Sequence, residues 1–505
     1  MVNEVELKLR IAAPDILRLK HHPAIKAAQV GKPRTHNLLS IYYDTPQLTL
    51  RDLDISLRVR RVSRNWIQTI KGKGGVLAGL HQRQEFEDVI AFGHPDFSKI
   101  IDPALTQIFD DQLLRNSLAP IFSTEIQRTE WQLAFDNGDQ IELALDIGEL
   151  VVGDKREPIS EVELELKQGN IGRLFEFALK LQQNIPLELE NISKAQRGYA
   201  YYHSQPLVIV RANPVQLHRD MSANEALRLI AWECLAHLQG NQEMVLHGED
   251  IEGLHQMRVA LRRLRSAFNV FRQIASKQSS ASIVEECRWL ASVFGHARDL
   301  DVFITQTLPP VLQQLNNHPS LVLLNKKAEH SRVKAYAAVR KALSSQRYHR
   351  LLLTLGYWLE NECWHDNSAV ECSVFDIAKT MLKKRQKQLK QHGRRLMHAH
   401  PEERHVTRIA AKKLRYTTEF FACLYKEVRL REFLSGLTKL LDNLGVLNDI
   451  IVTETLVRHL IGKYPKSVSN EALYLVTGWN SYKAMHYKQD LEHLWNRFAS
   501  QKSLR

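Results

Sequence analysis

The chain has 505 residues and a formal net charge of +13 at pH 7, and 44% of its residues are hydrophobic. This composition is typical of globular proteins, the length favours at least two domains, and no apolar run reaches the roughly eighteen residues of a membrane-spanning helix. The acidic start of the chain argues against a signal peptide, and the five cysteines include no C-x-x-C pair. We therefore expect a cytoplasmic protein with no membrane partner, whose cysteines are reduced and buried.

Residues 1–203, which carry a net charge of −3, are predicted to consist mainly of β-strands. Alternation of apolar and polar residues predicts strands at 3–10, 38–43, 55–61, 66–71, 83–89, 124–135, 140–147 and 159–167. Asn137-Gly138 predicts a turn between two of them. Helical spacing of apolar residues predicts helices at 14–22, about 102–117 and 170–183.

Several of these strands carry charges along their polar face. In "NEVELKLR" (3–10) the alternation places Glu4, Glu6 and Lys8 on one side, and "EVELELK" (161–167) repeats this arrangement with three glutamates. Each strand taken alone is interpreted most simply as one whose polar face meets water. Acids nevertheless cluster on some strands and bases on others. If the sheet closes on itself, these faces would line its interior, where divalent cations and a polyanion would neutralise them.

These residues resemble the CYTH superfamily, the triphosphate tunnel metalloenzymes. The E-x-E-x-K signature lies at Glu4, Glu6 and Lys8. Further motifs follow in order through residues 1–203: "YYDT" (42–45), "LRVR" (57–60), "TIKG" (69–72), "RQE" (83–85), "LDIG" (145–148), "EVELELK" (161–167) and "SKAQRG" (193–198). The resemblance implies an eight-stranded antiparallel tunnel that binds a linear triphosphate with one or two ions of Mg²⁺ or Mn²⁺.

The resemblance also implies a role for each charged side chain of the tunnel. Glu4, Glu6 and Glu165 would hold the first ion. The candidates for the second ion and for orienting water are Glu85, Glu87, Asp146 and Glu163. The cations that would bind the phosphates are Lys8, Arg58, Arg60, Lys71, Arg83, Arg128, Lys194 and Arg197. Tyr42 and Asp44 are expected to be mainly structural, and Glu161 and Lys167 are expected to lie at the rim.

The substrate is expected to be a triphosphate without a large organic group. Members of the superfamily act on inorganic triphosphate, thiamine triphosphate, RNA 5′-triphosphates or ATP. Trp66 and Trp131 fit apolar strand faces, so no aromatic cluster is predicted that would stack on a base or a thiazole ring. This favours hydrolysis of inorganic tripolyphosphate to diphosphate and phosphate. The alternatives are a thiamine triphosphatase, a class IV adenylate cyclase, or a non-catalytic protein that binds polyphosphate or nucleic acid.

Residues 204–217, which include Pro206 and Pro214, are predicted to be a linker, and residues 218–500 are predicted to be helical almost throughout. The part of the chain from residue 204 onward carries a net charge of +16. Two blocks repeat in it at an offset of 150 residues. "HQMRVALRRLRSAFNVF" (255–271) aligns with "HVTRIAAKKLRYTTEFF" (405–421), and "FGHARDLDV" (294–302) aligns with "LGVLNDIIV" (444–452). The chain is therefore predicted to have an α+β fold, with a β tunnel followed by a duplicated all-α domain.

Each repeat carries a basic stripe on one side of its predicted helix. The two stripes consist of His255, Arg258, Arg262 and Arg265 in the first copy and His405, Arg408, Lys412 and Arg415 in the second. One such stripe alone would be interpreted as a solvated helix face, but neither stripe contains an acid over three turns. Two stripes that form one cationic groove suit a periodic phosphate chain better than the bases of a nucleic acid. This half resembles the CHAD domain, which implies that the stripes bind long-chain polyphosphate.

Overall fold

The computed structural model describes residues 2–272, 274–275, 277–361, 373–394, 396, 399–465, 468–501 and 504. The chain divides into two compact units. The first comprises Met1–Leu207 together with Ser344–Glu362, and the second comprises Val208–Leu343 together with Cys363–Arg505. Helix α14 (Gln346–Glu360) therefore belongs to the first unit, although the sequence alone places it within the helical half. No helix among the described residues has the length and apolar character needed to cross a membrane.

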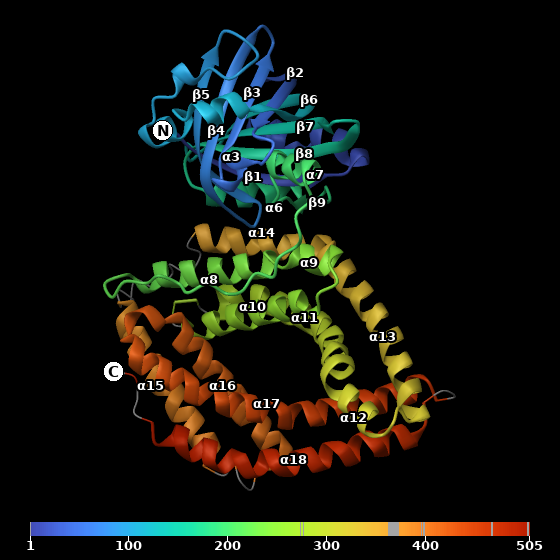
Figure 1. The fold of residues 1–505 in the computed structure, drawn as a ribbon. Coiled ribbons are helices and arrows are strands. Elements are labelled where there is room, and N and C mark those ends of the chain that lie inside the picture. Colours follow the sequence, from blue (N-terminus) through green and yellow to red (C-terminus); the bar gives the residue numbers. More distant parts are fainter. Residues whose placement is uncertain are drawn as a thin grey trace. The chain divides into compact units, whose positions relative to one another are not determined.

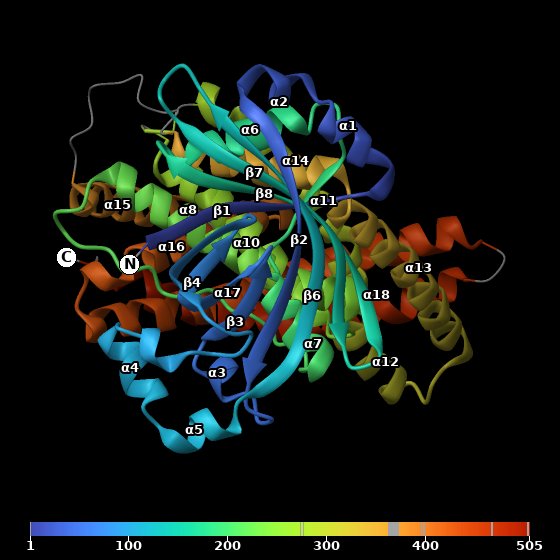
Figure 2. The same cartoon turned by 90° about the horizontal axis from the view of Figure 1, so that it is seen from above.

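The first unit is built on a closed antiparallel barrel (Figures 1 and 2). Its strands are β1 (Val2–Ile11), β2 (Gln29–Asp44), β3 (Ser56–Val62), β4 (Asn65–Leu77), β5 (Leu80–Ile90), β6 (Ala119–Ala134), β7 (Gln140–Val152) and β8 (Lys155–Gln168). Hydrogen-bonded neighbours follow the order β5-β4-β3-β2-β6-β7-β8-β1, and a further pairing of β1 with β5 closes the ring. The predicted eight-stranded antiparallel tunnel is thus confirmed.

Apart from α14, the other helices and the ninth strand of the first unit are short. They are α1 (Ile16–Lys20), α2 (Pro23–Ala28), α3 (Thr49–Asp52), α4 (Pro103–Phe109), α5 (Gln112–Ser117), α6 (Gly172–Leu181), α7 (Lys194–Tyr202), and a ninth strand, β9 (Leu187–Leu189), which pairs with β1. The predicted turn at Asn137-Gly138 joins β6 to β7, and Gly138 takes the positive φ of 88° that favours glycine there. Asp44 is confirmed as structural, because its carboxylate accepts hydrogen bonds from the N–H groups of Leu50 and Arg51.

The alternation within each strand decides which side chains enter the barrel. On β1, Leu7 and Leu9 are fully buried on the outer face, while Glu6 and Lys8 point into the barrel. On the outer side of β3 and β4, an apolar cluster forms with helices α4 and α5; it includes Leu57, Val59, Ile70, Leu105 and Phe109. Because the apolar faces are covered from outside, the charged faces are left to line the interior.

The second unit is helical. Its helices are α8 (Ala223–Gln239), α9 (Gln242–His247), α10 (Ile251–Val270), α11 (Lys277–Val302), α12 (Leu308–Gln314), α13 (Pro319–Leu343), α15 (Val374–Gly393), α16 (Pro401–Phe420), α17 (Glu427–Lys463) and α18 (Asn470–Ala499). The first copy of the sequence repeat lies on α10 and α11, and the second copy lies on α16 and α17. The two helices of each copy pack on each other, and α10 also packs on α16 and α11 on α17. Phe271 and Phe421, which occupy equivalent positions in the two copies, meet with ring centroids 5.9 Å apart. The duplication predicted from the sequence is therefore present in the fold.

The segment predicted as a linker contains no helix or strand, but from Val208 onward it belongs to the second unit. Val210 exchanges two hydrogen bonds with the side chain of Asn241, at 3.1 and 2.8 Å. Further along, the N–H of Leu217 donates to Sγ of Cys423 at 3.2 Å. Cys423 is an exposed free thiol, contrary to the expectation that all cysteines are buried, whereas Cys234 and Cys287 are buried as expected. The remaining two, at positions 363 and 372, lie outside the described residues.

Candidate functional site

A cavity of about 260 Å³ lies inside the barrel, and side chains from all eight strands line it. Its lining consists of Glu4, Glu6, Lys8, Tyr42, Ser56, Arg58, Arg60, Lys71, His81, Arg83, Glu85, Glu87, Arg128, Glu130, Glu142, Glu163, Glu165, Lys167, Ser193, Lys194 and Ala195. Of these 21 described residues, eight are acidic and eight are lysine or arginine. The wall therefore balances in formal charge, which distinguishes it from a simple anion-binding site.

The cavity brings together most of the residues that the sequence predicts for the tunnel. Two predicted residues, Asp146 and Arg197, are not part of the lining. Asp146 is completely buried behind the wall, where Nε and Nη2 of Arg128 donate to its two oxygens at 2.7 and 2.6 Å. Arg197 forms an ion pair with Glu157 at 2.6 Å and donates to the carbonyl of Pro158 at 2.9 Å. These contacts anchor Arg197 to β8.

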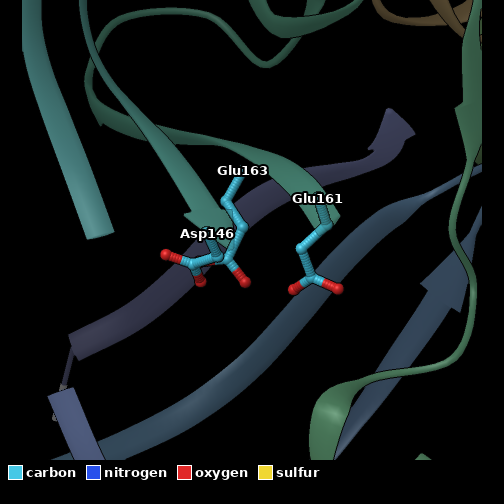
Figure 3. Close-up of side chains that lie close together, drawn as sticks. All are labelled: Asp146, Glu161 and Glu163. Atoms are coloured by element: carbon cyan, nitrogen blue, oxygen red, sulfur yellow. The ribbon is translucent and has the colours of Figure 1, made fainter. Parts of the chain in front are cut away.

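Asp146, Glu161 and Glu163 form a buried acidic group on the neighbouring strands β7 and β8 (Figure 3). Each can present one carboxylate oxygen so that the three oxygens lie within 4.8 Å of one another. Lys194 reaches all three acids, with Nζ 2.7 Å from Asp146 and 2.9 Å from Glu163. Glu161 was expected at the rim, and this is wrong, since it is only 1% exposed and pairs with Lys194.

Asp146, Glu163 and the bases around them are held in their charged forms, whereas burial and the charge of Glu163 raise the pKa of Glu161. Burial opposes ionisation of Asp146, but the charges of Arg128 and Lys194 lower its pKa to about 2. Burial also disfavours the charged form of Lys8, yet Glu163 and Glu6 raise the pKa of Lys8 well above its usual value. The formal charges of the three acids and of the three cations Lys8, Arg128 and Lys194 cancel, which makes their burial tolerable.

A second group of ion pairs lies on β1, β3, β4 and β5. Lys71 pairs with Glu4 and lies 3.3 Å from Glu85. Arg58 lies 3.7 Å from Glu85 and 3.5 Å from Glu87. The four acids predicted for a second metal ion thus fall into two groups, since Glu85 and Glu87 pair with different cations from Asp146 and Glu163.

A row of three acids crosses the strands β1, β8 and β7. Glu6 lies directly opposite Glu165, and Glu165 lies directly opposite Glu142. Carboxylates that face each other across strands repel. Burial raises the pKa of Glu165, Lys167 lowers it through an ion pair of 2.6 Å, and the charges of Glu4 and Glu142 raise it further. The donor set and its excess of negative charge fit a divalent cation.

Three arginines of the cavity, Arg58, Arg60 and Arg83, are only partly compensated by hydrogen-bond acceptors. Burial, followed by the positive charges of Arg58 and Arg128, lowers the pKa of Arg60 to about 10. Nε of Arg58 and Nε of Arg83 are buried with no hydrogen-bond acceptor among the described residues. Unpartnered guanidinium donors that line a cavity favour an anionic ligand with several oxygens.

Sequence reasoning missed several lining residues, among them His81, Glu130, Glu142 and Ser193. Glu142 and Glu130 share strand faces with predicted residues, so the alternation alone contains the signal that they enter the barrel. His81 has no such signal. It is buried on β5 opposite Glu6 of β1, and its Nε2–H donates to the carbonyl of Glu190 at 3.0 Å.

The second unit contains a cavity of about 730 Å³ beside α10 and α16. It gathers five of the eight predicted stripe residues: His255, Arg262, Arg408, Lys412 and Arg415. Arg211 and Arg263, which the sequence analysis did not select, also line it, as do the acids Glu252, Glu419, Asp442 and Asp449.

The other three stripe residues are not part of this lining. Arg258 donates to the carbonyl of Ala291 at 3.2 Å. Arg265 is half-buried, and burial followed by the charge of Arg288 lowers its pKa. His405 is exposed, with Nδ1 2.8 Å from Oδ1 of Asn448.

Crowding of cations is the main electrostatic feature of the helical cavity. Burial, followed by the positive charges of Arg408 and Arg262, lowers the pKa of Lys412 to about 7. Nε of Arg408 is buried and finds no hydrogen-bond acceptor in the part of the chain that the structure describes. An anion placed between these side chains would relieve both conditions.

Known proteins match different parts of the chain. The family described as CYTH domain matches residues 3–199, and the family described as CHAD domain matches residues 229–458. The inorganic triphosphatase of Haemophilus influenzae is 34% identical over 201 residues, which are 39% of this chain and 55% of that protein. An uncharacterised protein of Mycobacterium tuberculosis is 31% identical over 218 residues, which are 41% of this chain and 39% of that protein.

The helical half also resembles a solved structure. The crystal structure of the CHAD domain from Ricinus communis superimposes with a TM-score of 0.54 at 30% identity, covering 59% of this chain and 99% of that one. The match with the curated relatives spans about half of their length or less. The chain therefore contains a CYTH domain followed by a CHAD domain, and its helical half belongs to the CHAD family.

Proposed function

We propose that the barrel hydrolyses inorganic tripolyphosphate to diphosphate and phosphate with the help of Mg²⁺ or Mn²⁺. The observation that carries this proposal is the lining of the cavity, in which eight acids face eight bases. Bases alone would suffice for a phosphate chain, whereas balanced charges suit a ligand that brings both phosphates and divalent cations. The identity to the inorganic triphosphatase of Haemophilus influenzae over this half supports the same activity.

The lining also supports an inorganic substrate. Tyr42 is the one phenol or indole side chain among the described lining residues, and it is 4% exposed and stacks on Phe122 at 4.5 Å between centroids. Trp131 is buried in the core, as expected. A nucleobase or thiazole ring would find no free aromatic surface here, which disfavours adenylate cyclase and thiamine triphosphatase activity.

Two sets of acids fit divalent cations. We assign the first ion to Glu4, Glu6 and Glu165, with Glu142 as an additional ligand. Glu6, Glu165 and Glu142 form the row with excess negative charge, and Glu4 lies on the same face of β1 as Glu6. Of the four acids predicted for a second ion, we propose Glu85 and Glu87, which line the cavity together. Asp146 is covered by Arg128, and Glu163 is paired with Lys8 and Lys194. When bound, such ions supply Lewis-acid stabilisation of the charge on the transferred phosphoryl group.

The cations of the chain would hold the phosphates. Arg58, Arg60 and Arg83 offer guanidinium N–H groups without carboxylate hydrogen bonds at Nε, and these would bind phosphate oxygens. Lys8, Lys194 and Arg128 are fixed by buried acids, so their positive ends need little reorganisation when a ligand arrives. Asp146, buried behind Arg128, would act by orienting that guanidinium.

The test is a comparison of substrates. Phosphate release from tripolyphosphate, ATP and thiamine triphosphate is measured with and without Mg²⁺ or Mn²⁺. We expect fast, metal-dependent release from tripolyphosphate only. Equal turnover of thiamine triphosphate, or formation of cyclic AMP from ATP, would favour an alternative activity, and no turnover would favour a non-catalytic binding protein.

We further propose that the helical cavity binds long-chain polyphosphate through Arg262, Arg408, Lys412 and Arg415, with Arg258, Arg265, His255 and His405 extending the basic surface. The supporting observation is the crowding of Arg262, Arg408 and Lys412 in this cavity, where burial and the charges of the two arginines lower the pKa of Lys412 to about 7. Salt-sensitive binding of long-chain polyphosphate by the full chain, tighter than binding of duplex DNA, is the expected result. Tighter binding of DNA would contradict it.

The buried free thiols Cys234 and Cys287 suit a cytoplasmic location.

A further inference from the structure

Helix α14 is part of the barrel unit, although its neighbours in sequence, α13 and α15, belong to the helical unit. It packs on α6 and on β9. Its Gly356 lies against Phe175 so closely that a Cβ there would be 2.4 Å from the ring. This contact leaves no space for a side chain, so the helix is fitted to the barrel unit at this point.

The backbone of β9 is held from both sides. On one side the strand pairs with β1, with Leu187 opposite Ile11 and Leu189 opposite Leu9. On the other side α14 supplies acceptors. The N–H of Leu189 donates to Nδ1 of His349 at 3.1 Å, and the N–H of Leu187 donates to Oε1 of Gln346 at 3.2 Å. A strand of three residues has few bonds of its own, so these two acceptors contribute much to its position.

His349 presents the acceptor that this bond requires. The side chain is 2% exposed, and Leu189 is 4% exposed, so water does not replace the bond when it is lost. Burial, followed by the charge of Arg10, lowers the pKa of His349 to about 4, so Nδ1 carries a free lone pair at neutral pH.

The residues that follow β9 lead directly into the cavity. The N–H of Glu190 donates to the carbonyl of Lys8 at 2.9 Å, and the carbonyl of Glu190 accepts from His81 at 3.0 Å. Oδ1 of Asn191 accepts from the N–H of Gly79 at 2.8 Å. Three residues later comes Lys194, which pairs with the buried acids. The position of β9 therefore sets the backbone of two lysines that line the cavity, Lys8 and Lys194.

We propose that His349 is a positioning residue for the cavity of the barrel, so that a helix from the middle of the helical half is needed for full turnover there. The inference rests on the proposed triphosphatase function, because turnover is one of its readouts. His349 is not among the residues that line the cavity. It holds the backbone of β9, and β9 in turn positions Lys8 and Lys194, which would bind the phosphates.

The test uses two variants of the full chain. His349→Leu removes the acceptor, whereas His349→Asn keeps an acceptor oxygen near the place of Nδ1. We expect His349→Leu to lower kcat/KM for tripolyphosphate by about tenfold or more, mainly through KM, and His349→Asn to restore most of it. Hydrogen exchange at the amide of Leu189 should be faster in His349→Leu and near wild type in His349→Asn. Polyphosphate binding by the helical cavity should be unchanged in both.

Further variants keep the inference falsifiable. If His349→Leu does not fold, Gln346→Leu removes the neighbouring acceptor and should change KM in the same direction to a smaller extent. Arg350→Ala, on an exposed position of α14, is the matched control and should resemble wild type. Wild-type kcat/KM in folded His349→Leu would overturn the inference. If the wild-type protein does not turn over tripolyphosphate, the proposed function fails. Two other measurements then decide the inference about His349: hydrogen exchange at the amide of Leu189 and the affinity of the variants for tripolyphosphate.

Discussion

Glu6 and Glu165 lie directly opposite each other where β1 pairs with β8, and both carboxylates line the cavity of the barrel. Two facing acids destabilise a strand pair unless a cation lies between them. Lys8 pairs with Glu6 at 2.8 Å and Lys167 pairs with Glu165 at 2.6 Å, yet Glu142 adds a third negative charge on β7. This relationship is the basis of the proposed metal site.

Replacing Glu165 by Gln should affect stability in opposite directions with and without metal. In the metal-free protein the change removes a repulsion of roughly 0.2–1 kcal/mol, so the melting temperature should stay the same or rise slightly. Saturating Mg²⁺ should stabilise the wild type by a few kcal/mol, about 2.7 kcal/mol at a hundredfold excess over Kd, and the variant much less. Thermal unfolding with and without Mg²⁺ measures this. Glu149→Gln, at an exposed glutamate of β7, serves as control, and equal Mg²⁺ effects in all three proteins would contradict the assignment.

Replacing Asp146 by Asn should destabilise the barrel strongly. The change leaves Arg128 and Lys194 buried with less negative charge, and breaking such a buried pair costs about 3–5 kcal/mol. The pKa of Asp146 is lowered from 3.8 to about 2, so its ionisation stabilises the fold above pH 3.8, and this contribution is lost as the pH falls through about 2. Urea unfolding should therefore show a large difference between wild type and variant at neutral pH that shrinks in strong acid. The exposed Asp154→Asn variant should show neither effect.

Polyphosphate binding by the helical cavity should weaken as the pH rises through 7. Lys412 of the free protein has a pKa of about 7, and a bound anion raises it, so binding takes up a proton and is favoured at lower pH. Affinity measured between pH 6 and 9 should fall in the wild type and change little in Lys412→Arg, which stays charged.

The same residue has a predictable effect on stability. The pKa of Lys412 is 10.5 in an unperturbed side chain and about 7 in the folded protein. Because the unfolded state binds this proton more tightly, Lys412 destabilises the fold at every pH below about 10.5, and the effect is complete below about 7. Lys412→Met should therefore melt at a higher temperature than wild type at pH 7 or below, and the two proteins should converge in alkali. A lower melting temperature of the variant at pH 6 would contradict this account.

The arginines of the helical cavity should determine the salt dependence of binding. Arg262→Ala and Arg408→Ala should each weaken polyphosphate binding and reduce the slope of log affinity against log salt by about one, the loss expected for one phosphate contact. Arg431→Ala changes an arginine of α17 that is 77% exposed and paired with Glu427, so its slope should be that of wild type. Identical slopes in all of these proteins would place the polyphosphate elsewhere.

Much of the barrel was predictable, because strict alternation fixes both the strands and the face that enters the interior. The positions of strand ends were not. The strand β8 begins at Lys155, whereas the alternation is recognisable only from residue 159, and this is why Glu161 was expected at the rim although it is buried. Asp146 was expected to contact a metal, but in the structure the side chain of Arg128 covers its carboxylate. Whether a neighbouring side chain covers an acid depends on tertiary packing, which the alternation along a strand does not contain.

The place of α14 could not be predicted for a similar reason. The segment "QRYHRLLLTLGYWLE" has the spacing of any buried helix, and nothing in it states which unit it packs against. In the helical unit, the repeat identified α10 and α16 correctly, but a helical wheel does not show that Arg258 and Arg265 lie outside the cavity that Arg262 lines.

The central claim is tested most directly by the Mg²⁺ dependence of phosphate release from tripolyphosphate in wild type, Glu6→Gln and the control Glu149→Gln. The account predicts no release without a divalent cation, a drop of about a hundredfold or more in Glu6→Gln at every Mg²⁺ concentration, and wild-type behaviour of the control. Release that is independent of divalent cations, or a Glu6→Gln variant with the rate and Mg²⁺ dependence of wild type, would contradict it.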